Sequence, residues 1–429
     1  MANRRRVERW ASAIAAATLC FVGGSFVTDF NVTPGPQMRD AWRGARAAAR
    51  WLNDDPKGTR LAQFRPTRDA RVGVVTHEAS ACPGWTLFTT AAAPKATLID
   101  LQGQVIQTWQ LSLQDAARGL NLGIIRSEHV YWRKAELTAE GGVVAIYTEA
   151  GTTPWGRGLV RVDAKSQLQW YYPGRAHHDF DLLEDERIMT LVHELRATTA
   201  PAYKHLKAPL LENFVVELNA AGKPIRKVSL TQAVAESPYK SLLVLSGTHR
   251  RSRAKFDYLH PNAVHVVRAS EAVHLPEAVT GDVLVHTRPE SALILLSWPQ
   301  GKVKWVKMTP MTGGHDPTLL PNGDFLGFDN RGHIGPEGAS RVVQFSLDRR
   351  RQPWSYVGSA AEPLQSMIRS AIQPLCNNHV LITESDAGKI LEVNRQGQVV
   401  WSYQPPERDE KTTAAVCQAL RYSTLPWRK

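Results

Sequence analysis

The chain has 429 residues, of which 43% are hydrophobic and 21% charged, the composition of a folded globular protein. The formal net charge is +12, but residues 1–70 hold 12 Lys and Arg against 6 Asp and Glu, so half of the excess lies in the N-terminal segment. The rest of the chain is only mildly basic, which gives no sign of a nucleic-acid-binding stripe and fits a site for small anionic molecules.

The first residues are typical of an export segment. Four arginines within the first nine residues precede an uncharged run from Trp10 to Thr28. That run approaches the length of about 17–25 residues that a membrane-spanning helix needs. No Ala-x-Ala cleavage site follows it, which favours an uncleaved anchor over a cleaved signal. We therefore expect residues 1–30 to be a signal peptide or signal anchor, with a periplasmic body tethered to the inner membrane.

Residues 31–71 are predicted to be a linker, in which Ala41–Leu52 has the spacing of a short amphipathic helix. From residue 72 to residue 429, short β-branched runs alternate with Gly, Asp, Asn and Pro, a pattern that predicts strands and turns. Loops are expected around Ala197–Leu210 and Glu236–Asp257, where the spacing of the strands widens.

One hairpin pattern recurs six times as a strand, a polar turn and a strand that usually ends in Trp. The copies are Ala96–Leu111, Gly158–Tyr172, Phe214–Leu230, Ala292–Val306, Arg341–Tyr356 and Lys389–Tyr403. Another hairpin precedes most of them, and two hairpins make the four strands of one propeller blade. The sequence therefore predicts an all-β, six-bladed β-propeller, with the tryptophans that end the hairpins packed between blades: Trp109, Trp170, Trp305, Trp354 and Trp401.

A histidine recurs at one phase of this repeat. His315 and His178 occupy equivalent positions, His260 falls near the same level, and Ser370 and, more loosely, Arg133 take that place in other units. The innermost strands of a propeller line its central channel, so these side chains are expected at one channel mouth. The second strand of each hairpin returns to the same rim. This adds Arg288 and the strand ends Asp329–Asn330, Val192–His193 and Glu384–Ser385.

The remaining histidines are given simpler interpretations. His177 is taken as a neighbour of His178, and strand or loop positions are assigned to His265, His274 and His286. His77 and His193 each precede a Glu without completing His-Glu-x-x-His, and His193 is the one expected to approach the site. Asp181 and Asp316 are expected to hydrogen-bond their own hairpins.

Several imidazoles beside an arginine suit the transfer of a compact anionic group. A neutral imidazole is a good nucleophile, cations can hold the oxygens of the moving group, and histidine moves protons near neutral pH. No phosphate-binding loop, dinucleotide fingerprint or Gly-x-Ser-x-Gly occurs, and no Cys/His spacing typical of zinc. No cofactor and no metal are therefore expected. Two of Cys82, Cys376 and Cys417 could form a disulfide, and the sequence leaves the pair open.

Six segments resemble the bacterial aryl sulfotransferases that work without a nucleotide sulfate donor. They are HHDFDLL at 177–183, DYLHPNAV at 257–264, GDVLVHTR at 281–288, GGHDPTLLPNGDFLGFDN at 313–330, ITESDAGKILEVNRQGQVVWSY at 382–403 and ALRYSTLPW at 419–427. Their order and spacing carry the resemblance, which spans roughly residues 75–425.

The resemblance implies transfer of a sulfuryl group from an aryl sulfate to a phenol by a ping-pong route through a sulfohistidine. It implies that His315 is the nucleophile, that His178 and His260 bind sulfuryl oxygens and handle the phenolic proton, and that Arg288 stabilises negative charge. Asn262 and Asn330 would be supporting donors. His193, which the repeat pattern and not the resemblance brings to the rim, is expected to help bind the substrate. The expected partners are small molecules rather than nucleic acid, and homo-oligomerisation is left open. A non-catalytic periplasmic binding or scaffolding propeller and a quinone-dependent propeller are the alternatives.

Overall fold

The computed structural model of the chain describes residues 15–16, 18–20, 22–24, 63–248, 257–330 and 340–427. The chain divides into two compact units, residues 1–59 and residues 60–429. In the first unit the described residues are helical. No helix within the described ranges is both long enough and apolar enough to cross a membrane. Most of the run from Trp10 to Thr28, and all of Ala41–Leu52, lie outside these ranges.

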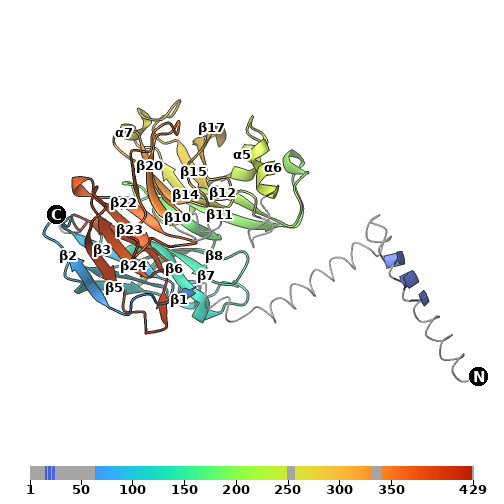
Figure 1. Cartoon of the computed structure of the whole chain (residues 1–429). Helices are drawn as coiled ribbons and strands as arrows, with labels where there is room; N and C mark the ends of the chain where they lie inside the picture. The colour runs from blue at the N-terminus through green and yellow to red at the C-terminus, as the bar shows by residue number, and fades with distance from the viewer. Residues whose placement is uncertain are drawn as a thin grey trace, which may run out of the picture. The chain divides into compact units, whose positions relative to one another are not determined.

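In its described residues the second unit contains six antiparallel sheets of four or five strands, which follow one another along the chain, and one two-stranded sheet (Figure 1). We number these blades one to six and give their strands from the innermost outward. Blade one holds β27 (Val416–Tyr422), β3 (Trp85–Thr90), β4 (Lys95–Ile99) and β5 (Val105–Gln110). Blade two holds β6 (Val130–Leu137), β7 (Val143–Glu149), β8 (Gly156–Val162) and β9 (Leu168–Tyr172). Blade three holds β10 (Ala176–Leu182), β11 (Ile188–Arg196), β12 (Leu210–Leu218) and β13 (Pro224–Ser229).

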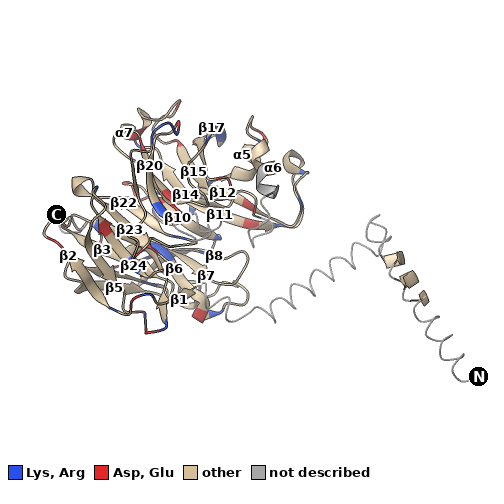
Figure 2. Cartoon of the chain, viewed as in Figure 1, with Lys and Arg blue, Asp and Glu red and all other residues tan. Residues whose placement is uncertain are grey.

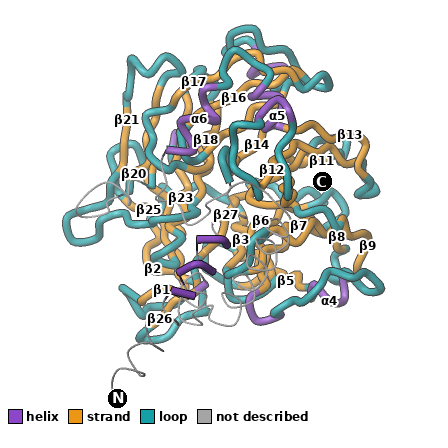
Figure 3. Tube along the Cα trace, turned by 90° about the vertical axis from the view of Figure 1, so that its right-hand side faces the viewer, coloured by secondary structure: helices purple, strands orange, loops and turns teal. Residues whose placement is uncertain are grey.

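The other three blades repeat this order. Blade four holds β14 (Pro261–Val266), β15 (Val283–Thr287), β16 (Ala292–Ser297) and β17 (Lys302–Met308). Blade five holds β18 (His315–Leu319), β19 (Phe325–Asp329), β20 (Arg341–Phe345) and β21 (Trp354–Tyr356). Blade six holds β22 (Ala371–Pro374), β23 (Val380–Glu384), β24 (Lys389–Val393), β25 (Val399–Gln404) and β2 (Gly73–His77). The outer strands β9, β13 and β21 lie at the periphery of the trace in Figure 3. The predicted six-bladed β-propeller is therefore confirmed, and each recurring hairpin forms the third and fourth strands of a blade.

Both ends of the propeller take part in closing the ring. The C-terminal strand β27 pairs with β3, and the N-terminal strand β2 pairs with β25 of blade six. A short sheet of β1 (Phe64–Pro66) and β26 (Thr412–Ala414) joins the two ends again. A disulfide links Cys82, between β2 and β3, to Cys376 of blade six across 294 residues, which leaves Cys417 as a buried free thiol. Of the pairs that the sequence left open, the structure contains this one.

The hairpin tryptophans pack between blades, as predicted. Trp109, Trp305 and Trp401 are buried, and all five indole N–H groups donate to a backbone carbonyl. Four of the five accepting carbonyls belong to a turn of the adjacent blade; Trp401, for example, donates to Leu101 O at 2.9 Å. Burial of the indole ring and the hydrogen bond of its N–H group thus join neighbouring blades.

The predicted insertions are irregular segments with short helices. The first contains the turn η2 (Pro201–Tyr203), and the second contains α6 (Ser241–Thr248), which follows α5 (Leu230–Ala235). The connection between β14 and β15 is lengthened by α7 (Ala269–Ala272). The short helices α4 (Leu113–Ala116) and η1 (Ser127–His129) lead from blade one towards blade two, and η3 (Cys376–Asn378) lies between β22 and β23.

Charged residues of both signs are interleaved over the sheets (Figure 2). Several form ion pairs between blades, such as Arg161 of β8 with Glu186 of blade three at 2.8 Å, and Lys95 of β4 with Glu407 at 2.6 Å. Such pairs hold adjacent blades in register, although exposed pairs stabilise a fold by less than about 1 kcal/mol each.

Candidate active site in the central channel

Each blade places one polar residue where its innermost strand begins. In blade order from one to six these residues are Cys417, Arg133, His178, His260, His315 and Ser370. All except His260 line one small cavity of about 30 Å³, to which Asn262 of the same blade contributes. His260 lies against His178, with their ring centroids 4.9 Å apart. The structure therefore brings together the residues that the repeat phase placed at one level.

The backbone at this level is bulged. The register of strand pairing shifts in five of the innermost strands, β6, β10, β14, β18 and β27. Positive φ angles occur at His178 (59°), His260 (39°), Asp316 (54°) and Ser370 (75°). Such conformations cost on the order of 1–3 kcal/mol each in a non-glycine residue and tend to occur at functional sites. The bulges were not evident from the sequence.

Aspartates after the bulges tie each blade to the next. Asp179 Oδ2 accepts a hydrogen bond from Val264 N at 2.8 Å, and Asp181 Oδ2 accepts one from Val266 N at 2.7 Å. Asp316 Oδ2 accepts one from Ile372 N at 2.8 Å. The prediction that Asp181 and Asp316 bond their own hairpins is therefore wrong. A bulge leaves N–H groups without a ladder partner, and the carboxylate of the preceding blade supplies one.

The orientation of His315 is set by Asn330. The amide Nδ2 of Asn330 donates to Ser366 O at 2.7 Å and Arg369 O at 3.2 Å, so its Oδ1 faces His315 Nδ1, at 2.6 Å. Because an amide oxygen can only accept, Nδ1 must carry the proton. The lone pair of His315 is thereby assigned to Nε2.

Electrostatics keep this imidazole neutral. Burial holds the pKa of His315 well below its usual value, and the positive charges of Arg288 and Arg133 lower it further. Burial also lowers the pKa of Arg288, whereas the negative charge of Asp257 acts to raise it. Arg288 follows β15, and its backbone N–H donates to His260 O at 3.2 Å, which places the arginine beside the histidines at the predicted rim.

His260 and His178 are each positioned by a second side chain. Asp257 Oδ2 lies 2.8 Å from His260 Nδ1 and is itself buried, with Asn213 donating to its other oxygen at 3.0 Å. Burial works against ionisation of Asp257, but His260 and Asn213 hold its pKa below the usual value. His178 Nδ1 lies 2.7 Å from His177 Nδ1. Burial, with the charges of His260 and His177, lowers the pKa of His178 well below its usual value.

Several residues of this cluster were missed or given a lesser place by sequence reasoning. His177 is fully buried and is part of the cluster, where its ring stacks on His193 with ring centroids 4.3 Å apart. Trp155, which no motif marks, contacts four histidines: His177, His178, His193 and His260. His193 lies inside β11, where its Nε2 accepts from Gly156 N at 3.3 Å. Asp257, three residues before His260, was a signal that the sequence did offer.

His286 and Asn262 support the backbone next to His315. His286 is a strand residue of β15, as predicted, but its Nδ1 also bonds Asn262 Oδ1 at 2.7 Å. Asn262 Nδ2 in turn donates to Gly314 O at 2.7 Å, one residue before His315. Burial lowers the pKa of His286 to about 3, so this ring is neutral as well.

A separate group could be mistaken for a metal site. Cys82, His379 and Glu392 have ligand atoms within 4.8 Å of one another. However, the sulfur of Cys82 belongs to the disulfide, and Glu392 is paired with Arg421 at 3.1 Å and with His379 at 2.8 Å. These residues therefore form a closed internal network rather than an open set of metal ligands.

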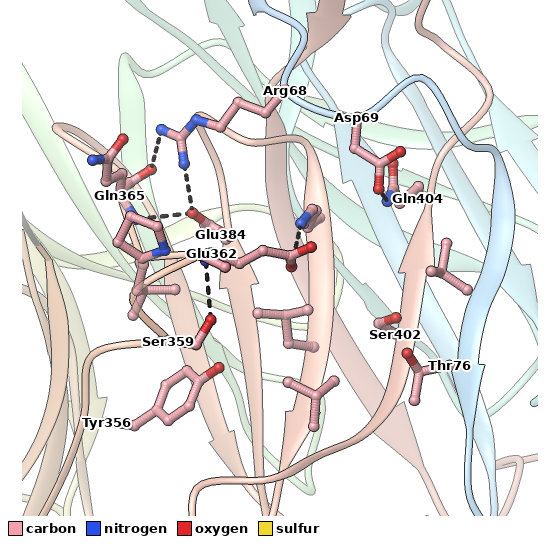
Figure 4. A pocket seen from close by; sticks show the side chains of 18 of the residues that line it. Arg68, Asp69, Thr76, Tyr356, Ser359, Glu362, Gln365, Glu384, Ser402 and Gln404 are labelled. Atoms are coloured by element: carbon pink, nitrogen blue, oxygen red, sulfur yellow. Dashed lines mark hydrogen bonds and ion pairs between the residues drawn. The ribbon is translucent and has the colours of Figure 1, made fainter.

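A larger cavity, of about 830 Å³, lies beside blade six (Figure 4). Its charged side chains are paired with one another: Arg68 with Glu384, Arg71 with Asp69, and Lys389 with Glu362. Glu384 from the predicted rim thus faces this cavity, whereas its neighbour Ser385 accepts from Ser370 N at 2.8 Å in the channel.

Comparisons with known proteins give one family match and several distant structural similarities. Among solved structures, a protein of unknown function from Bacteroides caccae is 15% identical, with 78% of this chain and 98% of that chain covered and a TM-score of 0.47. A virginiamycin B lyase from Staphylococcus aureus is 11% identical, with 81% and 89% covered and a TM-score of 0.41. No curated protein sequence matches. The model of the arylsulfotransferase (ASST) family matches residues 136–405, well over half of the chain and including all three channel histidines and Arg288. The chain therefore belongs to the arylsulfotransferase family, and this membership supports aryl sulfotransferase activity.

Proposed function

We propose that the protein moves a sulfuryl group from an aryl sulfate to a phenol through a sulfated His315. The observation that carries this proposal is the contact of His315 with Asn330, which leaves a neutral ring with its lone pair on Nε2. A neutral imidazole held in one tautomer beside a cation is suited to attack an anionic group.

In the first half-reaction, His315 Nε2 forms a bond to sulfur and the bond between sulfur and the aryl oxygen breaks. Arg288 balances the negative charge of the sulfuryl oxygens. His177 Nε2 is buried without a partner among the described residues, which favours a proton on its Nδ1, donated to His178 Nδ1. His178 would then present Nε2–H to a sulfuryl oxygen. The aryl oxide keeps the bonding electron pair and takes a proton from His260, whose Nδ1 lies 2.8 Å from the Asp257 carboxylate.

The second half-reaction runs the same steps in reverse with the acceptor. His260, now neutral, takes the proton of the phenol through Nε2, while its Nδ1–H remains hydrogen-bonded to the Asp257 carboxylate. The phenolate oxygen bonds to sulfur, the bond between sulfur and His315 breaks, and the free enzyme returns. Every bond and proton is balanced between donor, acceptor and side chains, so these residues need no further group.

The substrates implied are small aryl sulfates and phenols, and we propose that the protein works in the periplasm, held by its N-terminal segment. The disulfide between Cys82 and Cys376 supports an oxidising compartment. Fractionation of cells that express the full chain, followed by alkylation of free thiols with and without reduction, tests this location. Recovery in the cytoplasmic fraction with three reactive thiols outside the leader would contradict it.

The mechanism is tested with His315→Asn, which keeps a polar side chain of similar shape. Wild-type protein incubated with 4-nitrophenyl sulfate should release nitrophenol and gain an acid-labile mass of one sulfuryl group, whereas the variant should show neither and keep its thermal midpoint. A variant that retains transfer would sink the role of His315. Wild-type protein that gains no adduct and turns over no donor would instead support a non-catalytic binding module.

A further inference from the structure

Two buried arginines lie near each other at the channel mouth, one in blade two and the other just before the innermost strand of blade six. Arg133 of β6 is 8% exposed and lines the same cavity as His178 and His315. Arg369, which directly precedes Ser370, is 7% exposed. Its Nη2 donates to Tyr131 OH at 2.9 Å, and its guanidinium carbon lies 5.3 Å from the centre of the Tyr131 ring.

Neither arginine has a counter-ion among the described residues. Within the described ranges no carboxylate forms an ion pair with Arg133 or Arg369, and one terminal nitrogen of each, Nη1, is buried without a hydrogen-bond partner. The nearest acidic groups are already engaged: Asp179 with Lys134 at 2.7 Å, and Asp386 with Arg65 at 2.8 Å. Burial and the charge of Arg369 both lower the pKa of Arg133, whereas for Arg369 the lowering by burial is outweighed by Tyr131, Cys417 and Asp386, which raise its pKa. A buried cation without a partner is strongly unfavourable, so an anion that binds between the two arginines would be stabilised by them.

The pair is also coupled to the candidate nucleophile. The Arg369 carbonyl accepts from Asn330 Nδ2, the amide that orients His315. The charge of Arg133 contributes to the low pKa of both His178 and His315. An anion held by the two arginines would therefore lie next to the sulfuryl position, although Arg288 on the other side is the cation assigned to the sulfuryl group itself.

We propose that Arg133 and Arg369 bind a carboxylate carried by the ring of the aromatic substrate. A guanidinium matches the planar fork of a carboxylate, and Arg369 already stacks on an aromatic face. Resting on the proposed sulfuryl transfer, this assigns the preferred substrates to the phenols of aromatic acids and their sulfate esters.

The test measures binding of acceptors to the full-length protein by calorimetry, with no donor present, so that its result does not depend on turnover. The probes are 4-hydroxybenzoate and 4-hydroxybenzamide, which share their shape and differ in charge. Wild-type protein should bind the carboxylate at least about tenfold more tightly, because a hydrogen bond to a charged group is replaced by a neutral one. Arg369→Met and Arg133→Met should each reduce that ratio to within about twofold.

Arg395→Met is the matched control, because Arg395 also stacks on an aromatic ring, with its guanidinium carbon 4.8 Å from the centre of Trp354, but lies on blade six away from the channel. It should keep the full ratio. Arg369→Lys, which keeps the charge, should keep at least about threefold and serves if the Met variants do not fold. Equal binding of both probes to wild-type protein, or an unchanged ratio in Arg369→Met, would overturn the proposal even if sulfuryl transfer were established.

Discussion

At the scale of the residue, one asparagine decides which nitrogen of the candidate nucleophile is free. Asn330 has both amide protons committed to the carbonyls of Ser366 and Arg369, so its oxygen alone is left for His315. The imidazole thus has a fixed tautomer before any substrate arrives, which lowers the entropy cost of reaching the reactive geometry.

Replacing Asn330 with Leu should therefore reduce kcat by at least about 100-fold, the loss typical of removing a positioning contact at a reacting group. The reason is that His315 would be free to rotate and to exchange tautomers. The measurement is kcat and KM for 4-nitrophenyl sulfate, with KM expected to change less than kcat. Asn121→Leu, at an exposed loop position, is the control and should leave both constants unchanged. A kcat within threefold of wild type for Asn330→Leu would show that the tautomer is set in another way.

Sequence reasoning reached the main polar residues of the site because they share one phase of a repeat. His178, His260, His315 and Arg288 meet for that reason, and the structure places them together. It could not reach Trp155 or Arg369, because they come from connecting segments whose path depends on packing rather than on period. The tautomer of His315 was likewise invisible, since it depends on the carbonyls around Asn330.

At the scale of the element, a bulged inner strand followed by an aspartate is the unit that joins blades. The hydrogen bond from Val266 N to Asp181 Oδ2 measures 2.7 Å, and Asp181 also pairs with Arg268 at 2.7 Å. The hairpins themselves were predictable from alternation and turn residues. Their ties to the next blade were not, because a carboxylate that bonds its own hairpin and one that bonds a neighbour have the same sequence pattern.

Asp181→Ala should lower the free energy of unfolding by about 1–3 kcal/mol, because Val266 N and the Arg268 guanidinium both lose an acceptor at a largely buried position. Urea denaturation at pH 7.5 gives this difference. Asp185→Ala is the comparison, since Asp185 lies in the turn of the same hairpin, with its side chain 55% exposed and paired with Arg187. It should change stability by less than about 0.5 kcal/mol. Equal losses in the two variants would mean that the tie between blades contributes nothing.

At the scale of the whole molecule, the ring closes because the ends of the chain exchange strands. The six-bladed plan followed from counting hairpins, but the closure did not. β27 completes blade one and β2 extends blade six. Neither strand has a sequence motif that predicts the strand with which it pairs. The disulfide was open among three cysteines for the same reason, since only the closed ring brings Cys82 to Cys376.

The buried histidines make the stability of this ring depend on pH. Burial lowers the pKa of His177 and of His286 to about 3, whereas in the unfolded chain a histidine titrates at about 6.5. The unfolded state therefore binds protons first as the pH falls, and the stability present above pH 6.5 is lost between 6.5 and 3. At pH 5 each of these two imidazoles lowers the free energy of unfolding by about 2 kcal/mol. Asp316 acts in the opposite direction, because burial raises its pKa to about 6. Its protonation at pH 5 offsets about 1 kcal/mol of the free energy of unfolding that the histidines lose.

We therefore expect the free energy of unfolding, measured in urea, to fall by at least about 3 kcal/mol between pH 7.5 and pH 5.0. His286→Gln should reduce that fall by about 2 kcal/mol, because glutamine can still bond Asn262 but does not titrate. His274→Gln, at an exposed position, should leave the fall unchanged. If His286→Gln showed the same dependence as wild type, the ring of His286 would have to be equally protonated in the folded and unfolded states. Its burial next to the candidate nucleophile would then have to be relieved at pH 5, so the channel itself would have opened before the propeller unfolded.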